Sequence, residues 1–166
     1  DHLMAVLVRP FLIDIGFSSL ERGVVLALGG LGMSILGAYA SGYAVNRFGL
    51  RMMLWTMVML QILTNLGYVW LNASPTLPVF FVSVALEHVI GGMGAGVLAT
   101  LLMAQTRAEF SVVQISLFSF LSGLLSLVAG PVAGFMVHAM GWGSFFMTTL
   151  VAGVPSIVFL ALMLKN

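Results

Sequence analysis

The chain has 166 residues, of which 61% are hydrophobic and only 7% are charged. Because soluble domains carry about one quarter charged residues, this composition excludes a water-soluble globular domain and indicates a protein whose surface faces lipid. The net charge of +1 provides no basic field for nucleic acid, and the absence of cysteine excludes disulfides, thiolate metal sites and cysteine nucleophiles.

Uncharged apolar stretches predict an all-α fold, a polytopic bundle of six transmembrane helices, because a span needs about 20 apolar residues. We expect helices over residues 1–14, 20–46, 52–71, 77–104, 112–140 and 144–164. The first of these is too short to cross a bilayer unless residues upstream complete it, and Asp1 lies directly inside its apolar run. We therefore interpret residues 1–166 as one transmembrane domain of a longer protein whose N-terminal half is absent.

The breaks between these stretches carry residues that interrupt a helix. Pro75 and Pro78 follow the third stretch, and proline lacks the backbone donor that a helix interior requires. Residues 110–164 contain no Asp, Glu, Lys or Arg and are long enough for two passes. We divide them at residues 141–143, where Trp142 is suited by its indole N–H to the membrane interface.

The basic residues predict the orientation of the helices. Arg47, Arg51, Arg107 and Lys165 lie on one side of the membrane once the six helices alternate, whereas Arg22 lies on the other side with acids beside it. Basic loops stay in the cytoplasm. We therefore expect an integral membrane protein with a cytoplasmic C-terminus.

Small residues inside the apolar stretches predict close helix crossings, because they let membrane helices approach one another. Ser34, Ala38 and Gly42 form such a ridge on one face of the second helix. The glycine-rich run 91–96 in the fourth helix has two interpretations. We favour a tight helix crossing, and the alternative is a flexible point at which the helix bends during transport.

The hairpin after the second helix carries a spaced pattern made of Gly42, Asn46, Arg47, Gly49 and Arg51. It resembles the loop signature of the major facilitator superfamily, in which a glycine precedes an acid, a base, a second glycine and further basic residues. Asn46 stands at the position of the usual aspartate, as in the weaker copy that the family carries between its eighth and ninth helices. Gly49 is expected to take the positive φ of a tight turn.

Further short motifs are spread over essentially the whole chain. They are PFLI at 10–13, NLGY at 65–68, GGMG at 91–94, LLM at 101–103, GPVAG at 130–134, GW at 141–142 and VP at 154–155. In their order and spacing they resemble the AmpG-type muropeptide permeases of the same superfamily. The resemblance implies the C-terminal half of a twelve-helix fold, in which the predicted helices correspond to helices seven to twelve, and the seventh and tenth face a central cavity.

The same resemblance implies a function. Permeases of this type import anhydro-muropeptides across the bacterial inner membrane for cell-wall recycling, driven by the proton gradient. The expected partners are a small solute, protons, membrane lipid and the absent N-terminal half, and no nucleic acid is expected.

Among the ionisable residues of the predicted helices, Arg9 in the first and Glu87 in the fourth lie deep in apolar sequence. An ionised side chain in hydrocarbon costs about 2.5 kcal/mol or more, so we expect the two to form or approach a pair that lines the cavity. In the functional hypothesis Glu87 carries the coupling proton and Arg9 attracts a carboxylate of the substrate. In the structural alternative they are a permanent ion pair that joins two helices.

Other polar residues of the predicted helices have weaker assignments. His88 is expected to be a hydrogen-bonded packing residue or, as the alternative, a proton relay. Asp1 and Gln114 are further candidates for the cavity wall. Gln61 and Asn65, four residues apart on one helix face, are expected to make interhelical hydrogen bonds.

Three classes of function compete. We favour a proton-coupled transporter half over a non-transporting integral subunit that helps to assemble a larger membrane complex. An intramembrane enzyme is disfavoured, because metal-spaced histidines, a nucleophile beside a base and paired carboxylates are absent from the sequence. We therefore predict no catalytic residue, no bound metal and no cofactor.

Overall fold

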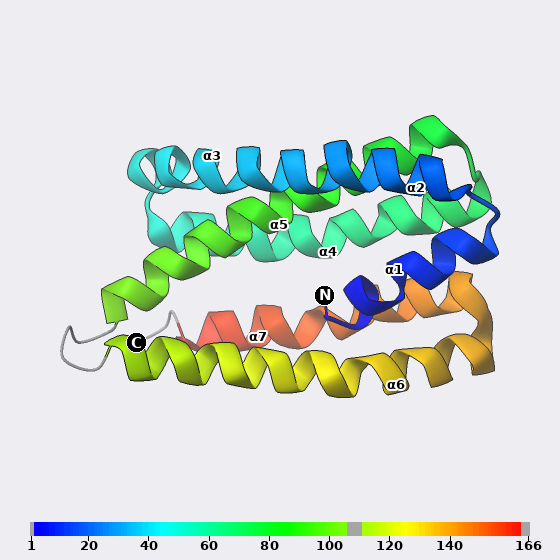
Figure 1. Cartoon of the computed structure of the whole chain (residues 1–166). Helices are drawn as coiled ribbons and strands as arrows, with labels where there is room; N and C mark the ends of the chain where they lie inside the picture. Colours follow the sequence, from blue (N-terminus) through cyan, green and yellow to red (C-terminus); the bar gives the residue numbers. More distant parts are fainter. Residues whose placement is uncertain (1, 106–110, 164–166) are drawn as a thin grey trace.

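The computed structural model describes residues 2–105 and 111–163, and every regular element among them is a helix. The elements are α1 (His2–Asp14), α2 (Ser19–Val25), the π-helix η1 (Leu26–Gly32), α3 (Met33–Phe48), α4 (Leu50–Ala73), α5 (Leu77–Gln105), α6 (Ser111–Ala152) and α7 (Val154–Met163). Figure 1 shows that most of them run along a common direction and form an elongated bundle. The predicted all-α fold class is confirmed for the described residues.

The connection between α1 and α2 is ordered by local hydrogen bonds. Gly16 has a φ of 93°, a conformation that favours glycine. The Ser18 hydroxyl accepts the Glu21 N–H at 3.2 Å, and the Glu21 carboxylate accepts the Ser18 N–H at 2.8 Å. This reciprocal capping box satisfies donors that the helix itself leaves unpaired, and α2 therefore begins at Ser19.

The predicted second helix, 20–46, corresponds to α2, η1 and α3, which follow one another without a loop from Ser19 to Phe48. Its π-helical part was not predicted. Gly29 and Gly30 of η1 are buried, and a Cβ added to Gly30 would lie 3.4 Å from Nε2 of His88 on α5. This segment therefore packs beside His88 of α5. Short π-helical segments within α-helices occur frequently at functional sites.

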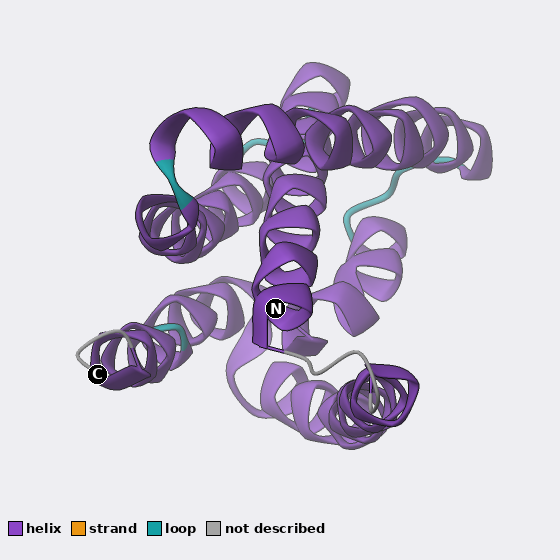
Figure 2. Ribbon diagram, turned by 90° about the vertical axis from the view of Figure 1, so that its left-hand side faces the viewer, coloured by secondary structure: helices purple, strands orange, loops and turns teal. Residues whose placement is uncertain are grey.

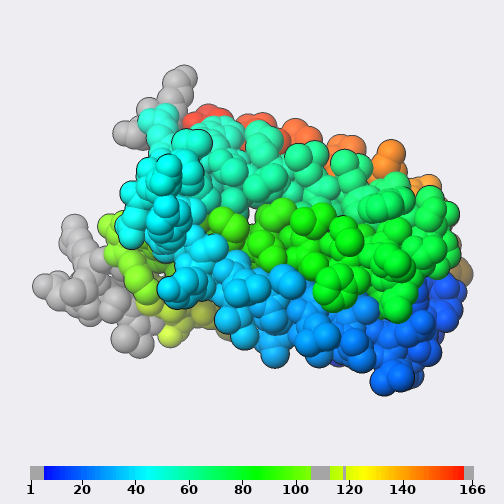
Figure 3. Space-filling model, turned by 90° about the horizontal axis from the view of Figure 1, so that it is seen from above, coloured from blue at the N-terminus to red at the C-terminus, as the bar shows by residue number. Residues whose placement is uncertain are grey.

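The closest helix crossing joins α3 and α5, which lie side by side in Figure 3. A Cβ on Gly37 would lie 2.1 Å from the carbonyl oxygen of Val89, and a Cβ on Gly92 would lie 2.2 Å from that of Ser34. The tight crossing predicted for the glycine-rich run of α5 is confirmed at Gly92. Of the predicted ridge, Ser34 lies at this crossing, whereas a Cβ on Gly42 would meet no atom of this chain within 4 Å, so Gly42 is not part of the crossing with α5.

Glycine and proline set the boundaries of the next two helices. Gly49, between α3 and α4, has a φ of 82°, so the positive φ predicted for this turn is confirmed. After α4 the chain turns through Pro75, and α5 begins at Leu77. Pro78 lies in the first turn of α5, where its missing N–H would have no partner within the helix.

The predicted helices 112–140 and 144–164 correspond to the two parts of α6 on either side of Gly141, together with α7. Gly141 has φ 76° and ψ 168° and interrupts the helical backbone. In Figure 1 the first part of α6 runs along the lower edge of the bundle, and the following residues return in the opposite direction to α7. The chain thus reverses where residues 141–143 were expected to divide two helices.

Four helical stretches of the described residues are long and apolar enough to cross a membrane. They are Ser19–Phe48, Leu50–Ala73, Leu77–Gln105 and Val113–Leu162. The last of these contains the reversal at Gly141, and α1, with 13 residues, is shorter than a span. The helices are those of a membrane bundle, and the count of six spans stays a prediction.

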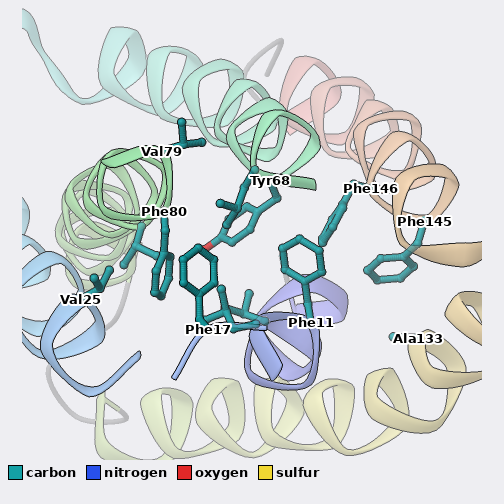
Figure 4. Packing of buried hydrophobic residues seen from close by; sticks show 13 residues of the cluster. Phe11, Phe17, Val25, Tyr68, Val79, Phe80, Ala133, Phe145 and Phe146 are labelled. Atoms are coloured by element: carbon teal, nitrogen blue, oxygen red, sulfur yellow. The ribbon is translucent and has the colours of Figure 1, made fainter. Parts of the chain in front are cut away.

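Aromatic side chains fill the centre of the main core. Phe11 of α1, Tyr68 of α4 and Phe146 of α6 are each at most 1% exposed, and Figure 4 shows them close together. Figure 2 views the bundle from one end, so that several helices are seen along their axes. These rings therefore join α1, α4 and the returning part of α6.

Candidate functional site

Glu87 lies within α5, and its side chain is 15% exposed. The hydroxyl of Tyr68, on the neighbouring helix α4, donates a hydrogen bond to Oε2 of this carboxylate. Tyr68 itself is 0% exposed. Because a buried acid needs a hydrogen-bond partner in either protonation state, the phenol meets that need, and the site consists of an acid and a phenol on adjacent helices.

His88 lies beside this acid but makes its main contact within α5. Its Nδ1 lies 2.9 Å from the carbonyl oxygen of Val84 and 3.7 Å from Oε2 of Glu87. A carbonyl oxygen can only accept a hydrogen bond, so Nδ1 carries the proton and Nε2 faces Gly30 of η1. The structure thus places the imidazole as a wall of the site, between α5 and the π-helix.

The expected pair between Arg9 and Glu87 is not formed, which corrects the sequence-based hypothesis. Arg9 is exposed on α1, and among the described residues Glu87 has Tyr68 and His88 as its polar contacts. The reason is the packing of the helices: α1 packs mainly against α6, whereas α5 packs against α3 and α4. The cost of two charges in the membrane did not determine which way each helix faces.

Two further residues were predicted to line the cavity. Gln114 is half-buried near the start of α6. Asp1 lies outside the described residues. Whether either residue faces a substrate stays a prediction.

The residues of the hairpin pattern lie together at one end of the bundle, where α3 meets α4. All five are exposed: Gly42, Asn46, Arg47, Gly49 and Arg51. Arg47 is in the last turn of α3, where a cation interacts favourably with the negative end of the helix dipole. The pattern therefore forms a solvent-accessible turn, and its role stays a prediction.

A second polar contact lies on the same face of α4 as Tyr68. The Nδ2 of Asn65 donates to the Thr149 hydroxyl at 3.3 Å, and both residues are buried. The interhelical hydrogen bond predicted for Asn65 is confirmed. Gln61, one turn further along this face, instead lines a cavity of about 510 Å³ between α4, α5 and the residues around Gly153.

This cavity begins one helical turn from Glu87 on α5, at Gly91. Its polar lining comes from Gln61, Asn65, Thr149 and Ser156. The remaining lining residues are glycines, alanines and apolar side chains of α4 and α5. Uncharged polar groups of this kind can hydrogen-bond water, so the acid lies close to a space with a partly polar wall.

Sequence reasoning missed Tyr68 as a functional candidate. The available signal was its position: Gln61, Asn65 and Tyr68 recur at steps of four and three residues and share one helix face. A tyrosine three residues after a buried asparagine extends the polar stripe toward the neighbouring helix. What the stripe did not indicate was its partner on α5.

The described part of the chain contains no group of three or more His, Asp or Glu side chains that could hold a metal ion. The polar contacts of the site are a carboxylate, a phenol and an imidazole. What these groups can do is bind, release and share a proton.

The chain is similar to named transporters over almost its whole length, although no family model matches it. It is 36% identical over 163 residues to the "Anhydromuropeptide permease" of Escherichia coli (strain K12). The aligned region includes 96% of this chain and 33% of that protein. It is 26% identical to "Putative transporter AmpG 4" of Rickettsia felis, over 100% of this chain and 40% of that protein. The corresponding protein of Rickettsia conorii is 27% identical and covers 96% of the chain.

These relatives confirm the resemblance to AmpG-type permeases. They also limit it, because the chain spans only between 33% and 40% of the length of the relatives named above. The relatives are named as permeases and transporters, a class of protein that is not enzymatic. The coarse assignment is therefore an integral membrane protein similar to part of a transporter.

Proposed function

We propose that this chain is the C-terminal six-helix half of a major facilitator permease that imports anhydro-muropeptides or related amphipathic solutes, coupled to protons. The name of the Escherichia coli relative supports the substrate class. The apolar helices support a location in the bacterial inner membrane. In such carriers two halves move about a shared site near the middle of the membrane, so the other half of the transporter is the expected partner.

The observation that carries the proton-coupling part of the proposal is the hydrogen bond between Tyr68 and Glu87. An acid within a spanning helix is costly when ionised and marks a pathway in many transporters. Glu87 has no cation within ion-pair distance among the described residues except the ring of His88, whose charge depends on its own protonation. An acid without a permanent counter-ion can exchange a proton during the transport cycle.

Arg9 has a separate proposed role. Its exposure on α1 leaves the guanidinium available to a carboxylate of the substrate's peptide portion, for which arginine has a matching planar donor geometry. We also propose that the end of the bundle with Arg47 and Arg51 faces the cytoplasm, which follows from the bias of basic residues toward that side. Accessibility labelling of a cysteine introduced at Asn46 would test this orientation.

The function is tested with the complete gene product in right-side-out and inverted membrane vesicles. Labelled anhydro-muropeptide should accumulate only when a proton gradient is imposed, and dissipation of the gradient should stop accumulation. Glu87→Gln should abolish the accumulation, whereas Glu21→Gln, the same change at the partly exposed capping acid of α2, should preserve it. Gradient-independent accumulation, or full activity of Glu87→Gln, would contradict proton coupling at this residue.

A further inference from the structure

Tyr68 of α4 contacts side chains of three other helices. Its ring is stacked against Phe146 of α6, with a centroid distance of 5.7 Å, and meets Phe11 of α1 edge-on at 6.5 Å. Its hydroxyl donates to Glu87 of α5. One side chain of α4 therefore connects the acid to α1 and to the returning part of α6, as Figure 4 shows for the rings.

The contact with Glu87 changes with the charge of the acid. An ionised carboxylate accepts the phenol hydrogen in a charge-assisted bond, which is roughly twice as strong as a bond between neutral groups. A protonated carboxyl group has a hydrogen of its own, so it can donate to the phenol oxygen instead of accepting from the phenol. The position of the Tyr68 hydroxyl is thus tied to whether Glu87 holds a proton.

His88 is less suited to this role. Its Nδ1 donates to the backbone carbonyl of Val84 at 2.9 Å and lies 3.7 Å from the carboxylate. Because this ring is hydrogen-bonded to its own helix, a change in the charge of Glu87 would have little effect on α1 or α6 through His88. Tyr68, in contrast, is packed by those two helices.

We propose that Tyr68 is a positioning residue for proton coupling: its hydroxyl holds the ionised carboxylate of Glu87, and its ring transmits the loss of that charge to α1 and α6. This inference rests on the proposed function, because it assigns the partner of the same acid. The two helices that receive the change include α1, which carries Arg9, the residue proposed to meet the substrate. Proton release and substrate contact are thereby linked through one buried ring.

The first test separates the hydroxyl from the ring in the complete gene product. Tyr68→Phe keeps the stacking on Phe146 and Phe11 and removes only the donor to Glu87. A purely structural tyrosine would be replaced by phenylalanine without effect. We expect gradient-driven uptake to fall by about tenfold, as for the loss of a hydrogen bond to a charged group, while solute exchange without a gradient is preserved. Tyr39→Phe is the matched control, because Tyr39 is 87% exposed on α3.

The second test does not depend on transport. A hydrophobic carbodiimide reacts with protonated carboxyl groups inside membranes, and mass spectrometry of the modified peptide reports the protonation of Glu87 directly. Removal of the phenol donor makes the ionised carboxylate less stable, so labelling of Tyr68→Phe at a fixed pH should be faster than labelling of the wild type. Glu87→Gln provides the blank.

The outcomes distinguish this inference from the function on which it rests. Full gradient-driven uptake by Glu87→Gln would overturn the proposed function. Uptake and labelling of Tyr68→Phe equal to the wild type, in a protein that Glu87→Gln inactivates, would overturn the role of Tyr68 alone. Slower uptake together with faster labelling would support it.

Discussion

The indole Nε1–H of Trp142 donates a hydrogen bond to the carboxylate of Asp14, with an N–O distance of 3.0 Å. The bond joins the end of α1 to the reversal in α6, 128 residues away along the chain. Phe11 packs against the same indole at a centroid distance of 5.1 Å. The two helices are thus held together at this end by one polar contact and one aromatic contact.

Asp14→Ala removes the acceptor of this bond. We expect the free energy of unfolding to fall by about 1 kcal/mol, measured by thermal unfolding of the detergent-purified complete protein. Asp14→Asn keeps an oxygen acceptor and should lose less. Equal stability of Asp14→Ala and the wild type would show that the bond contributes nothing.

Gly37→Ala places a Cβ against the backbone of α5, where the space is already occupied by the Val89 carbonyl at 2.1 Å. A backbone oxygen cannot move aside as a flexible side chain does, so α3 and α5 must separate. We expect a loss of about 2 kcal/mol, which is typical of overpacking, and a lower yield of folded protein by size-exclusion chromatography.

Gly42→Ala is the matched control for that crossing. It lies on the same helix, and its added Cβ meets no atom within 4 Å. Its stability should equal or slightly exceed that of the wild type, because alanine has the higher helix propensity. A similar loss in both variants would indicate that the crossing is not at Gly37.

Gly141→Ala tests the reversal in α6. At φ 76° and ψ 168° a side chain is strained, and we expect a destabilisation of about 1 to 3 kcal/mol. Gly134→Ala, in the regular part of α6 with nothing within 4 Å of its Cβ, should be neutral. The prediction fails if the two variants unfold at the same temperature.

Asn65 and Thr149 form a pair suited to a double-mutant cycle. Asn65→Leu and Thr149→Val remove the 3.3 Å hydrogen bond between α4 and α6 from either side. We expect a coupling free energy of about 0.6 kcal/mol, the average for such bonds in membrane bundles. The cycle of Gln61→Leu with Thr149→Val should give a coupling near zero, and a larger value there would contradict the assignment.

The amino-acid sequence by itself determined the helical class, the positions of the turns and the residues of interest. Apolar runs, prolines and glycines act on the chain within a few residues, which is why the turn at Gly49 and the reversal near Gly141 could be predicted. Glu87 was identified for the same reason, because an acidic residue inside an apolar run can be recognised from that run alone.

Only the tertiary structure decided which residues meet. Glu87 contacts Tyr68 and not Arg9, and the close approach of α3 to α5 lies at Gly37 and not at Gly42. The rotation of each helix about its axis depends on how all the helices pack together. A stripe of polar or small residues on one helix shows which face of that helix makes contacts. Which neighbouring helix this face contacts depends on how the whole bundle packs.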